Sequence, residues 1–178
     1  MSPAPLRGLA LYLVALAVQR GHELLISARN ARRLRARGAL EHGRTQLLPL
    51  IAIHAALPVA LTLEVLLAHA RPPAWWPVPL VVLVLAELLR LWSMAALGEY
   101  WTARVLVVQG QPRVRTGPYR WIAHPSYAAA ALELLAGPLL FGAWRTALVL
   151  TVLNAFAIAA RVRTERRALA KEALRTKW

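Results

Sequence analysis

The apolar residues of this chain lie in blocks of roughly 20 residues, which is the length that an α-helix needs to cross a lipid bilayer. Of the 178 residues, 58% are hydrophobic and only 17% are charged. A soluble domain of this length would carry more charge and shorter apolar runs. The blocks therefore predict an all-α, polytopic membrane helix bundle, with no room for a separate soluble domain.

We expect about five transmembrane helices and a single domain over residues 1–178. The blocks cover about residues 6–26, 46–69, 78–97, 125–141 and 146–160. A cleaved signal peptide is the alternative for the first block, but its amino-terminal region holds only Arg7 and no small-residue cleavage motif follows. Residues 1–97 would form three helices with a basic loop, and residues 98–178 a polar loop, a helical hairpin and a charged helical tail.

Two segments outside the apolar blocks complete this layout, one after the first block and one after the third. Residues 29–44 form a basic, partly helical surface loop, and residues 105–108 are too short to span and would lie against the bundle or the headgroups. Residues 109–112 read as a turn.

The net charge of +14 is concentrated beside the apolar blocks. Basic clusters in such positions set membrane topology and contact lipid headgroups, so nucleic acid is not an expected partner. The first loop and the tail hold seven basic residues each, and the third loop holds four. The positive-inside rule therefore places the amino terminus outside and the tail in the cytoplasm. The Arg-, Ala- and Leu-rich usage is typical of a GC-rich bacterial genome, which suggests a bacterial cytoplasmic membrane.

Several kinds of site are not indicated by the sequence. The chain has no cysteine, which excludes disulfides and thiolate chemistry. It contains no Gly-x-Gly-x-x-Gly, no Gly-x-Ser-x-Gly and no His-x-x-x-His pattern. We therefore expect no metal site, no soluble-type nucleotide fold and no serine hydrolase.

Charged residues inside the apolar blocks should face the interior of the bundle, because an intramembrane charge costs a few kcal/mol on lipid. Glu87 and Arg90 are three residues apart, so we expect them to neutralise each other. Glu133 could be structural or could line a pocket. We interpret His54 and Glu64 as structural.

The polar stretch 115–127 is the strongest candidate for a site. A turn at Gly117-Pro118 positions Tyr119, and His124 lies where the cap of the fourth helix is expected. Tyr127 follows in the first helical turn. The alternative is that the aromatic and basic residues of this stretch only anchor the chain in the headgroup region.

The start of the fourth helix could also bind an anion. Pro125 suits a first helical turn. The free N–H groups and the positive end of the helix dipole attract a carboxylate or phosphate, which Arg115 and Arg120 would flank.

Three motifs in this order resemble the isoprenylcysteine carboxyl methyltransferase family: Gly117-Pro-Tyr119, His124-Pro-Ser-Tyr127 and Arg163-Thr-Glu165. The resemblance covers about residues 98–170 and extends to the small membrane methyltransferases that include phospholipid N-methyltransferases. The chain departs from the family pattern at Ala123, where the family has Arg, and at Arg166, where it usually has a second Glu. At residues 128–129 it has Ala-Ala instead of a bulkier residue and Gly.

The resemblance implies transfer of a methyl group from S-adenosylmethionine to the oxygen of a lipophilic acceptor, a carboxylate, phenol or enol, within the bilayer. A phospholipid N-methyltransferase and a non-catalytic lipid-binding scaffold are the alternatives. His124 and Glu165 would be catalytic. The cofactor-binding residues implied are Arg115, Gly117, Tyr119, Arg120, His124, Pro125, Tyr127 and Glu165. The expected partners are the acceptor and membrane lipids.

Overall fold

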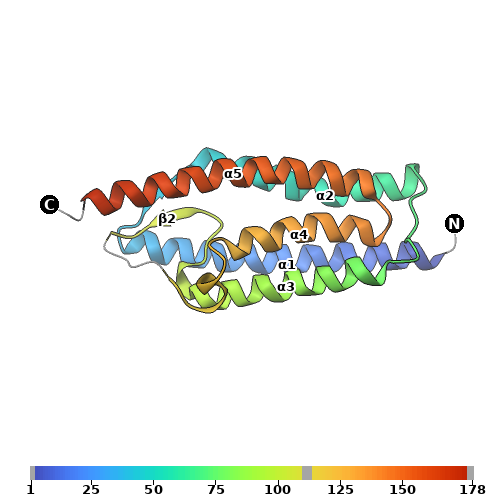
Figure 1. The fold of residues 1–178 in the computed structure, drawn as a ribbon, viewed down its shortest axis with the longest axis horizontal. Helices are drawn as coiled ribbons and strands as arrows, with labels where there is room; N and C mark the ends of the chain where they lie inside the picture. The colour runs from blue at the N-terminus through green and yellow to red at the C-terminus, as the bar shows by residue number, and fades with distance from the viewer. Residues whose placement is uncertain (1–2, 110–113, 176–178) are drawn as a thin grey trace.

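The computed structural model describes residues 3–109 and 114–175. Five helices run alongside one another as an elongated bundle (Figure 1). They are α1 (Pro3–Ala36), α2 (Leu47–Leu67), α3 (Pro77–Leu97), α4 (Pro125–Leu140) and α5 (Trp144–Arg175). The prediction of an all-α membrane bundle is confirmed.

Four helices in the described part of the chain are long and apolar enough to cross a membrane: Leu6–Ala36, Arg44–Leu67, Pro77–Tyr100 and Trp144–Arg167. The fifth, α4, has 16 residues and is therefore only about 24 Å long. That is shorter than the roughly 30 Å hydrocarbon core. Helix α4 packs against the longer helices α3 and α5. The four long apolar helices make the chain an integral membrane protein.

The apolar residues are divided between the interior and the lipid-facing surface. On α2, Ile53, Leu57, Leu61 and Val65 recur every fourth residue, so that they form one buried stripe. The outward faces of the helices carry large exposed apolar side chains, such as Phe156 on α5. A helix that is hydrophobic on all sides is expected where lipid, rather than water, surrounds the bundle.

One predicted loop is more ordered than the sequence indicated. The basic segment 29–36 is not a loop but the end of α1, which continues without a break to Ala36. Helix α4 ends at Leu140, one residue before the predicted end of its apolar block. The basic tail is helical, as predicted, and it continues α5 as far as Arg175.

A small antiparallel sheet forms where the sequence predicted only a surface segment. Strand β1 (Leu40–His42) pairs with β2 (Val105–Val107), with Glu41 opposite Leu106. Three short 3-10 helices lie near this end of the bundle: η1 (Arg44–Gln46), η2 (Gly98–Tyr100) and η3 (Gly117–Arg120). Most of the predicted turn at 109–112 lies outside the described residues.

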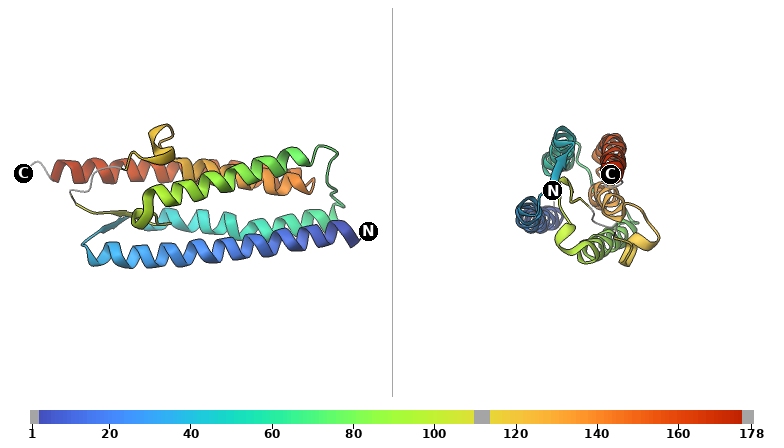
Figure 2. Two further views of the ribbon diagram at one scale, coloured as in Figure 1. Left: turned by 90° about the horizontal axis from the view of Figure 1, so that it is seen from below. Right: turned by 90° about the vertical axis from the view of Figure 1, so that its left-hand side faces the viewer.

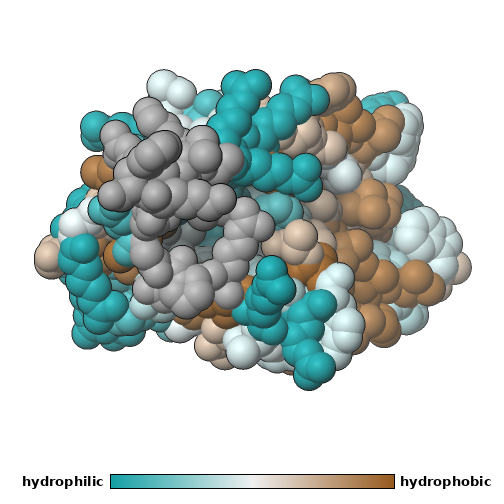
Figure 3. All heavy atoms as spheres, turned by 60° about the vertical axis from the view of Figure 1, so that its left-hand side comes forward, coloured by the Kyte–Doolittle hydropathy of each residue, from teal (hydrophilic) through white to brown (hydrophobic). Residues whose placement is uncertain are grey.

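The two ends of the bundle differ in character. The end of α1, the sheet and the end of α5 lie together, whereas the start of α1 lies at the opposite end (Figures 1 and 2). Hydrophilic side chains gather at the first of these ends, and the flank behind it is hydrophobic (Figure 3). We call the first end the polar end of the bundle.

Candidate functional site

A cavity of about 720 Å³ opens at the polar end of the bundle, between the end of α3, β2, the segment 114–127 and the tail half of α5. Its walls combine valines of β2 with aromatic and charged side chains. The polar and aromatic residues that line it are Tyr100, Thr102, Arg104, Arg115, Tyr119, His124, Ser126, Tyr127, Arg161, Glu165 and Arg166. The fold thus brings α5 beside a segment about 40 residues earlier in the chain.

Five of the residues that the sequence singled out line this cavity: Arg115, Tyr119, His124, Tyr127 and Glu165. Ala123, where the chain departs from the family pattern, lies in the wall as well. The structure therefore brings the two distant motifs together around one space.

The three other residues do not line the cavity but shape its surroundings. Gly117 has a positive φ of 56°, and a Cβ there would lie 2.8 Å from the Cβ of Ala96, so the turn that carries Tyr119 requires glycine. Pro125 is the buried first residue of α4. Arg120 points elsewhere, because its guanidinium lies 5.5 Å from the ring centre of Trp121.

A chain of hydrogen bonds fixes the carboxylate of Glu165. The Nε of Arg161 donates to the Tyr127 hydroxyl at 2.8 Å, and this hydroxyl donates to Oε2 of Glu165 at 3.0 Å. His124 stacks on the Tyr127 ring with the ring centres 5.3 Å apart, and its Nδ1 lies 3.9 Å from the same carboxylate oxygen. The imidazole and the carboxylate thus share one wall of the cavity.

Arg161 was missed by the sequence interpretation. It lies four residues before Glu165, on the same face of α5, which is the signal that could have identified it. It is 4% exposed, and its second contact is with the carbonyl oxygen of Ala103. Arg161 therefore ties α5 to the loop before β2 as well as to Tyr127.

Tyr119 enters the cavity from η3. Its hydroxyl lies 3.3 Å from the Oγ of Ser126 in the first turn of α4. Burial raises the pKa of Tyr119 above its usual value, so its phenol stays protonated at neutral pH and acts as a hydrogen-bonding group.

Glu41 of β1 holds the outer wall in place. It accepts hydrogen bonds from Arg35 at the end of α1, at 2.7 Å, and from Arg104 beside β2, at 2.5 Å. The hydrogen bond from Arg35 is the largest cause that lowers the pKa of Glu41 below its usual value, and the hydrogen bond from Arg104 lowers it further. The carboxylate is therefore charged at neutral pH and joins three elements around the cavity.

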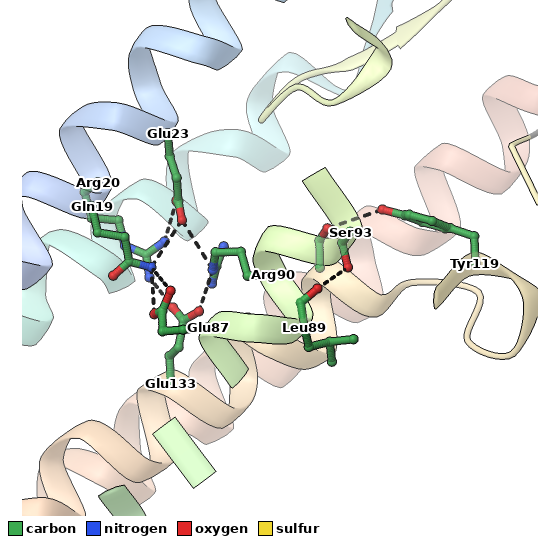
Figure 4. Close-up of polar contacts among 10 residues, drawn as sticks. Gln19, Arg20, Glu23, Glu87, Leu89, Arg90, Ser93, Tyr119 and Glu133 are labelled. Carbon is green, nitrogen blue, oxygen red and sulfur yellow. Dashed lines mark hydrogen bonds and ion pairs between the residues drawn. The ribbon is translucent and has the colours of Figure 1, made fainter. Parts of the chain in front are cut away.

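The charged residues inside the membrane pair differently from the prediction. Glu87 and Arg90 do not neutralise each other: Arg90 contacts Glu133 and Glu23, while Glu87 accepts from Gln19 (Figure 4). Three residues of separation allow contact on a helix, but oppositely charged partners on α1 and α4 are closer to the guanidinium of Arg90.

The two residues interpreted as structural make local contacts. The Nδ1 of His54 lies 2.8 Å from the carbonyl oxygen of Leu50 in the same helix. Glu64 accepts hydrogen bonds from the backbone N–H groups of Arg145 and Thr146, and so caps the start of α5 at the end of the bundle opposite the cavity.

Comparisons with known proteins agree with this arrangement. The isoprenylcysteine carboxyl methyltransferase (ICMT) family model matches residues 79–171, which contain every motif that lines the cavity from α3 onwards. The uncharacterized protein YpbQ of Bacillus subtilis (strain 168) is 35% identical over 159 residues, which are 89% of this chain and 95% of that protein. An uncharacterized protein of Haemophilus influenzae is 26% identical over 151 residues, 84% of this chain and 88% of that protein.

No solved structure matches the chain. The family match covers half of the chain, and its residues 98–171 include the segment 115–127 and the cavity-lining part of α5. The chain therefore belongs to the isoprenylcysteine carboxyl methyltransferase family of membrane methyltransferases.

Proposed function

We propose that this protein transfers a methyl group from S-adenosylmethionine to the oxygen of a lipophilic acceptor, a carboxylate, phenol or enol, within the bilayer. The observation that carries the proposal is the cavity at the polar end of the bundle. It combines the motifs of a methyltransferase family with a volume of about 720 Å³, which lies within the usual range for small-molecule sites.

The residues around the cavity fit the charged groups of S-adenosylmethionine. Glu165 is held in place by Tyr127 and can pair with the ammonium group of the cofactor. Arg115 and the first turn of α4 can receive its carboxylate. The ring of Tyr119 adds an aromatic face beside a sulfonium, a contact worth about 0.5–2 kcal/mol.

When bound, S-adenosylmethionine supplies the methyl group that an acceptor oxygen attacks; the S–CH₃ bond breaks as the O–CH₃ bond forms. The protein's part is to position the two reactants and to exclude water, because charge is neutralised during this transfer. For a carboxylate acceptor no proton has to move. For a phenol or enol, His124 can take the proton, with Glu165 3.9 Å away to stabilise the imidazolium.

We place the cavity on the cytoplasmic side of the membrane. The basic segments lie at the same end of the bundle as the cavity, as the positive-inside rule requires for a cytoplasmic face. A water-soluble cofactor would then reach the cavity from the cytoplasm, while the acceptor stays in the bilayer.

The test is methyl transfer by the purified full-length protein in lipid nanodiscs. Nanodiscs made with total bacterial lipid extract are incubated with S-adenosylmethionine labelled in its methyl group, and the labelled lipid is treated with alkali and analysed by mass spectrometry. We expect label in methyl esters, which alkali cleaves, or in methyl ethers, which it does not. Glu165→Ala and His124→Ala should each reduce the incorporation.

The control variant is His69→Asn, an exposed residue at the opposite end of the bundle, which should keep wild-type incorporation. Label found in methylammonium groups would instead identify a phospholipid N-methyltransferase. Absence of any labelled lipid, with the cofactor intact, would contradict the enzymatic proposal.

A further inference from the structure

A group of charged and polar side chains lies inside the bundle, below the cavity. It is formed by α1, α3 and α4, as Figure 4 shows. We call it the interior cluster; its members are Gln19, Arg20, Glu23, Glu87, Arg90 and Glu133. A second cavity of about 120 Å³ touches Gln19, Glu87 and Glu133.

All carboxylate oxygens of the interior cluster have a hydrogen-bond donor. Both oxygens of Glu87 accept from Gln19, and those of Glu133 accept from Arg20 and Arg90. Glu23 accepts from Arg20 at 2.6 Å and from Gln19 at 3.3 Å. The Nε of Arg20 and the Nη2 of Arg90 are buried and lack a partner among the described residues. The groups of the cluster that could still form a hydrogen bond are therefore N–H donors.

Asn154 on α5 adds a second, independent group of the same kind. Its side chain is fully buried, at 0% exposure, and neither its Nδ2 nor its Oδ1 has a hydrogen-bond partner within the described part of the chain. The neighbouring Leu150 and Ala157 on that face of the helix pack into the core with Leu57 and Leu134. Asn154 therefore points to the interior of the bundle, where an unpaired amide costs about 1–3 kcal/mol or more.

The spacing along the helices places these groups directly beyond the cavity. Leu97, Ser126 and Arg161 line the cavity, and Arg90, Glu133 and Asn154 lie seven residues from them on the same helices. Seven residues are two helical turns, about 10 Å, toward the centre of the bundle. The intervening side chains on these faces include small ones, among them the buried Ser93 and Ala130.

We propose that the interior cluster and Asn154 bind oxygen atoms in the head group of the methyl acceptor. This rests on the proposed function, in which the cofactor fills the water-facing cavity and the acceptor lies on its membrane side. The unpaired N–H groups of Arg20, Arg90 and Asn154 suit carbonyl, hydroxyl or carboxylate oxygens. An ammonium head group would meet two guanidinium groups whose carboxylate partners are already occupied. The acceptor is therefore an oxygen-bearing lipid and not an amine.

The Asn154→Leu variant separates this role from a structural one. Leucine has the same branched arrangement of side-chain heavy atoms, and Asn154 makes no side-chain hydrogen bond within the described residues that the fold would lose, so the unfolding temperature should stay the same or rise. Binding of S-adenosylmethionine should not change. The acceptor concentration that gives half-maximal methyl transfer should rise about tenfold, which corresponds to one lost hydrogen bond to the head group.

Asn30→Leu is the matched control. Asn30 is also buried, but its Nδ2 donates to the carbonyl oxygens of Gly98 and Trp101. Its loss should lower the unfolding temperature. Arg90→Lys is a second test variant, which keeps the positive charge beside Glu133 but removes the unpaired Nη2. Like Asn154→Leu, it should raise the acceptor concentration that gives half-maximal methyl transfer.

The assay uses full-length protein in nanodiscs, labelled S-adenosylmethionine and a titration of total bacterial lipid extract. A wild-type protein that binds no cofactor or methylates no lipid would contradict the proposed function. Normal cofactor binding and turnover, with the same half-saturation in wild type, Asn154→Leu and Arg90→Lys, would overturn only the present inference. In that case the interior groups bind water or contribute to folding alone.

Discussion

At the scale of single residues, Tyr127 contacts three other side chains of the candidate site. Its hydroxyl accepts from Arg161 and donates to Glu165, and its ring stacks on His124. The hydroxyl oxygen thus positions a cation and a carboxylate, and the ring positions an imidazole. Removing the hydroxyl should disturb the cofactor site without changing its shape.

Tyr127→Phe should therefore weaken binding of S-adenosylmethionine about tenfold or more. Hydrogen bonds to charged groups contribute about 1.5–3 kcal/mol, and the variant loses two of them. Isothermal titration with the detergent-purified protein measures the change. Tyr12→Phe, in the core near the opposite end, is the control and should bind like wild type. Equal affinities for wild type and Tyr127→Phe would show that Glu165 needs no support from Tyr127.

Gly117→Ala should displace the turn that carries Tyr119. The added methyl group would lie 2.8 Å from Ala96 and 3.1 Å from the indole nitrogen of Trp92, at a φ of 56° that disfavours alanine. We expect weaker cofactor binding and a lower unfolding temperature. Gly21→Ala in α1, where a Cβ would have no neighbour within 4 Å, should leave both unchanged or raise stability slightly. A Gly117→Ala protein as stable and active as wild type would contradict the role of this turn.

The local motifs of the site were predictable from the sequence, whereas one of its contacts was not. Tyr119 and His124 follow turn and capping signals, so their placement could be derived from short-range rules. Arg161 was missed, since a basic residue at a membrane edge usually faces solvent or headgroups, although its spacing of four residues from Glu165 places both on one face of the helix. Its contacts with Tyr127 and Ala103 depend on how α5 lies against α4 and the loop before β2.

At the scale of elements, the β1–β2 pair shows what hydropathy does not detect. Each strand has three residues, and the two are separated by two membrane helices in the sequence. A membrane helix can be predicted from the hydrophobic pattern of some 20 consecutive residues. The pairing of β1 with β2 cannot, because it depends on α1 and α3 ending at the same level of the bundle. The sequence predicted that the basic segment after the first block is only partly helical, whereas α1 continues through residues 29–36 without a break.

Glu41 makes this small sheet sensitive to pH. Its pKa in the folded protein lies below the usual 4.5 because Arg35 and Arg104 donate to the carboxylate. The stabilisation is fully present above about pH 4.5 and is lost as the pH falls through the lower pKa of the folded state. The unfolding temperature of wild type should therefore decline more steeply below this pH than that of Glu41→Gln. Parallel declines in both proteins would show that the Glu41 contacts add no stability.

At the scale of the whole molecule, the polar end collects the basic segments, the sheet and the cavity, while the amino-terminal end of α1 lies at the opposite end (Figure 1). We propose that the five helices cross the membrane an odd number of times, which would place the two termini on opposite sides. The short α4 counts as one crossing although it does not reach bilayer length, because it connects the polar end to the turn before α5. The basic segments lie at the polar end, as the proposed topology requires.

Cysteine labelling tests this topology without a background, because the natural chain has no cysteine. Arg37→Cys and Arg163→Cys should react with an impermeant maleimide only after the cytoplasmic side is opened. Trp75→Cys, in the turn between α2 and α3, should react in intact cells. The reverse pattern would place the cavity on the outer face, where cytoplasmic S-adenosylmethionine cannot reach it.

The central claim is that the cavity at the polar end is a site for S-adenosylmethionine, and equilibrium binding of this cofactor to the full-length protein tests it most directly. Wild type should bind with a dissociation constant in the micromolar range, and Glu165→Gln should weaken binding about tenfold, since the ion pair with the ammonium group is lost. His69→Asn should bind like wild type. Absence of binding by the intact, folded protein in lipid nanodiscs, or binding that Glu165→Gln leaves unchanged, would contradict the account.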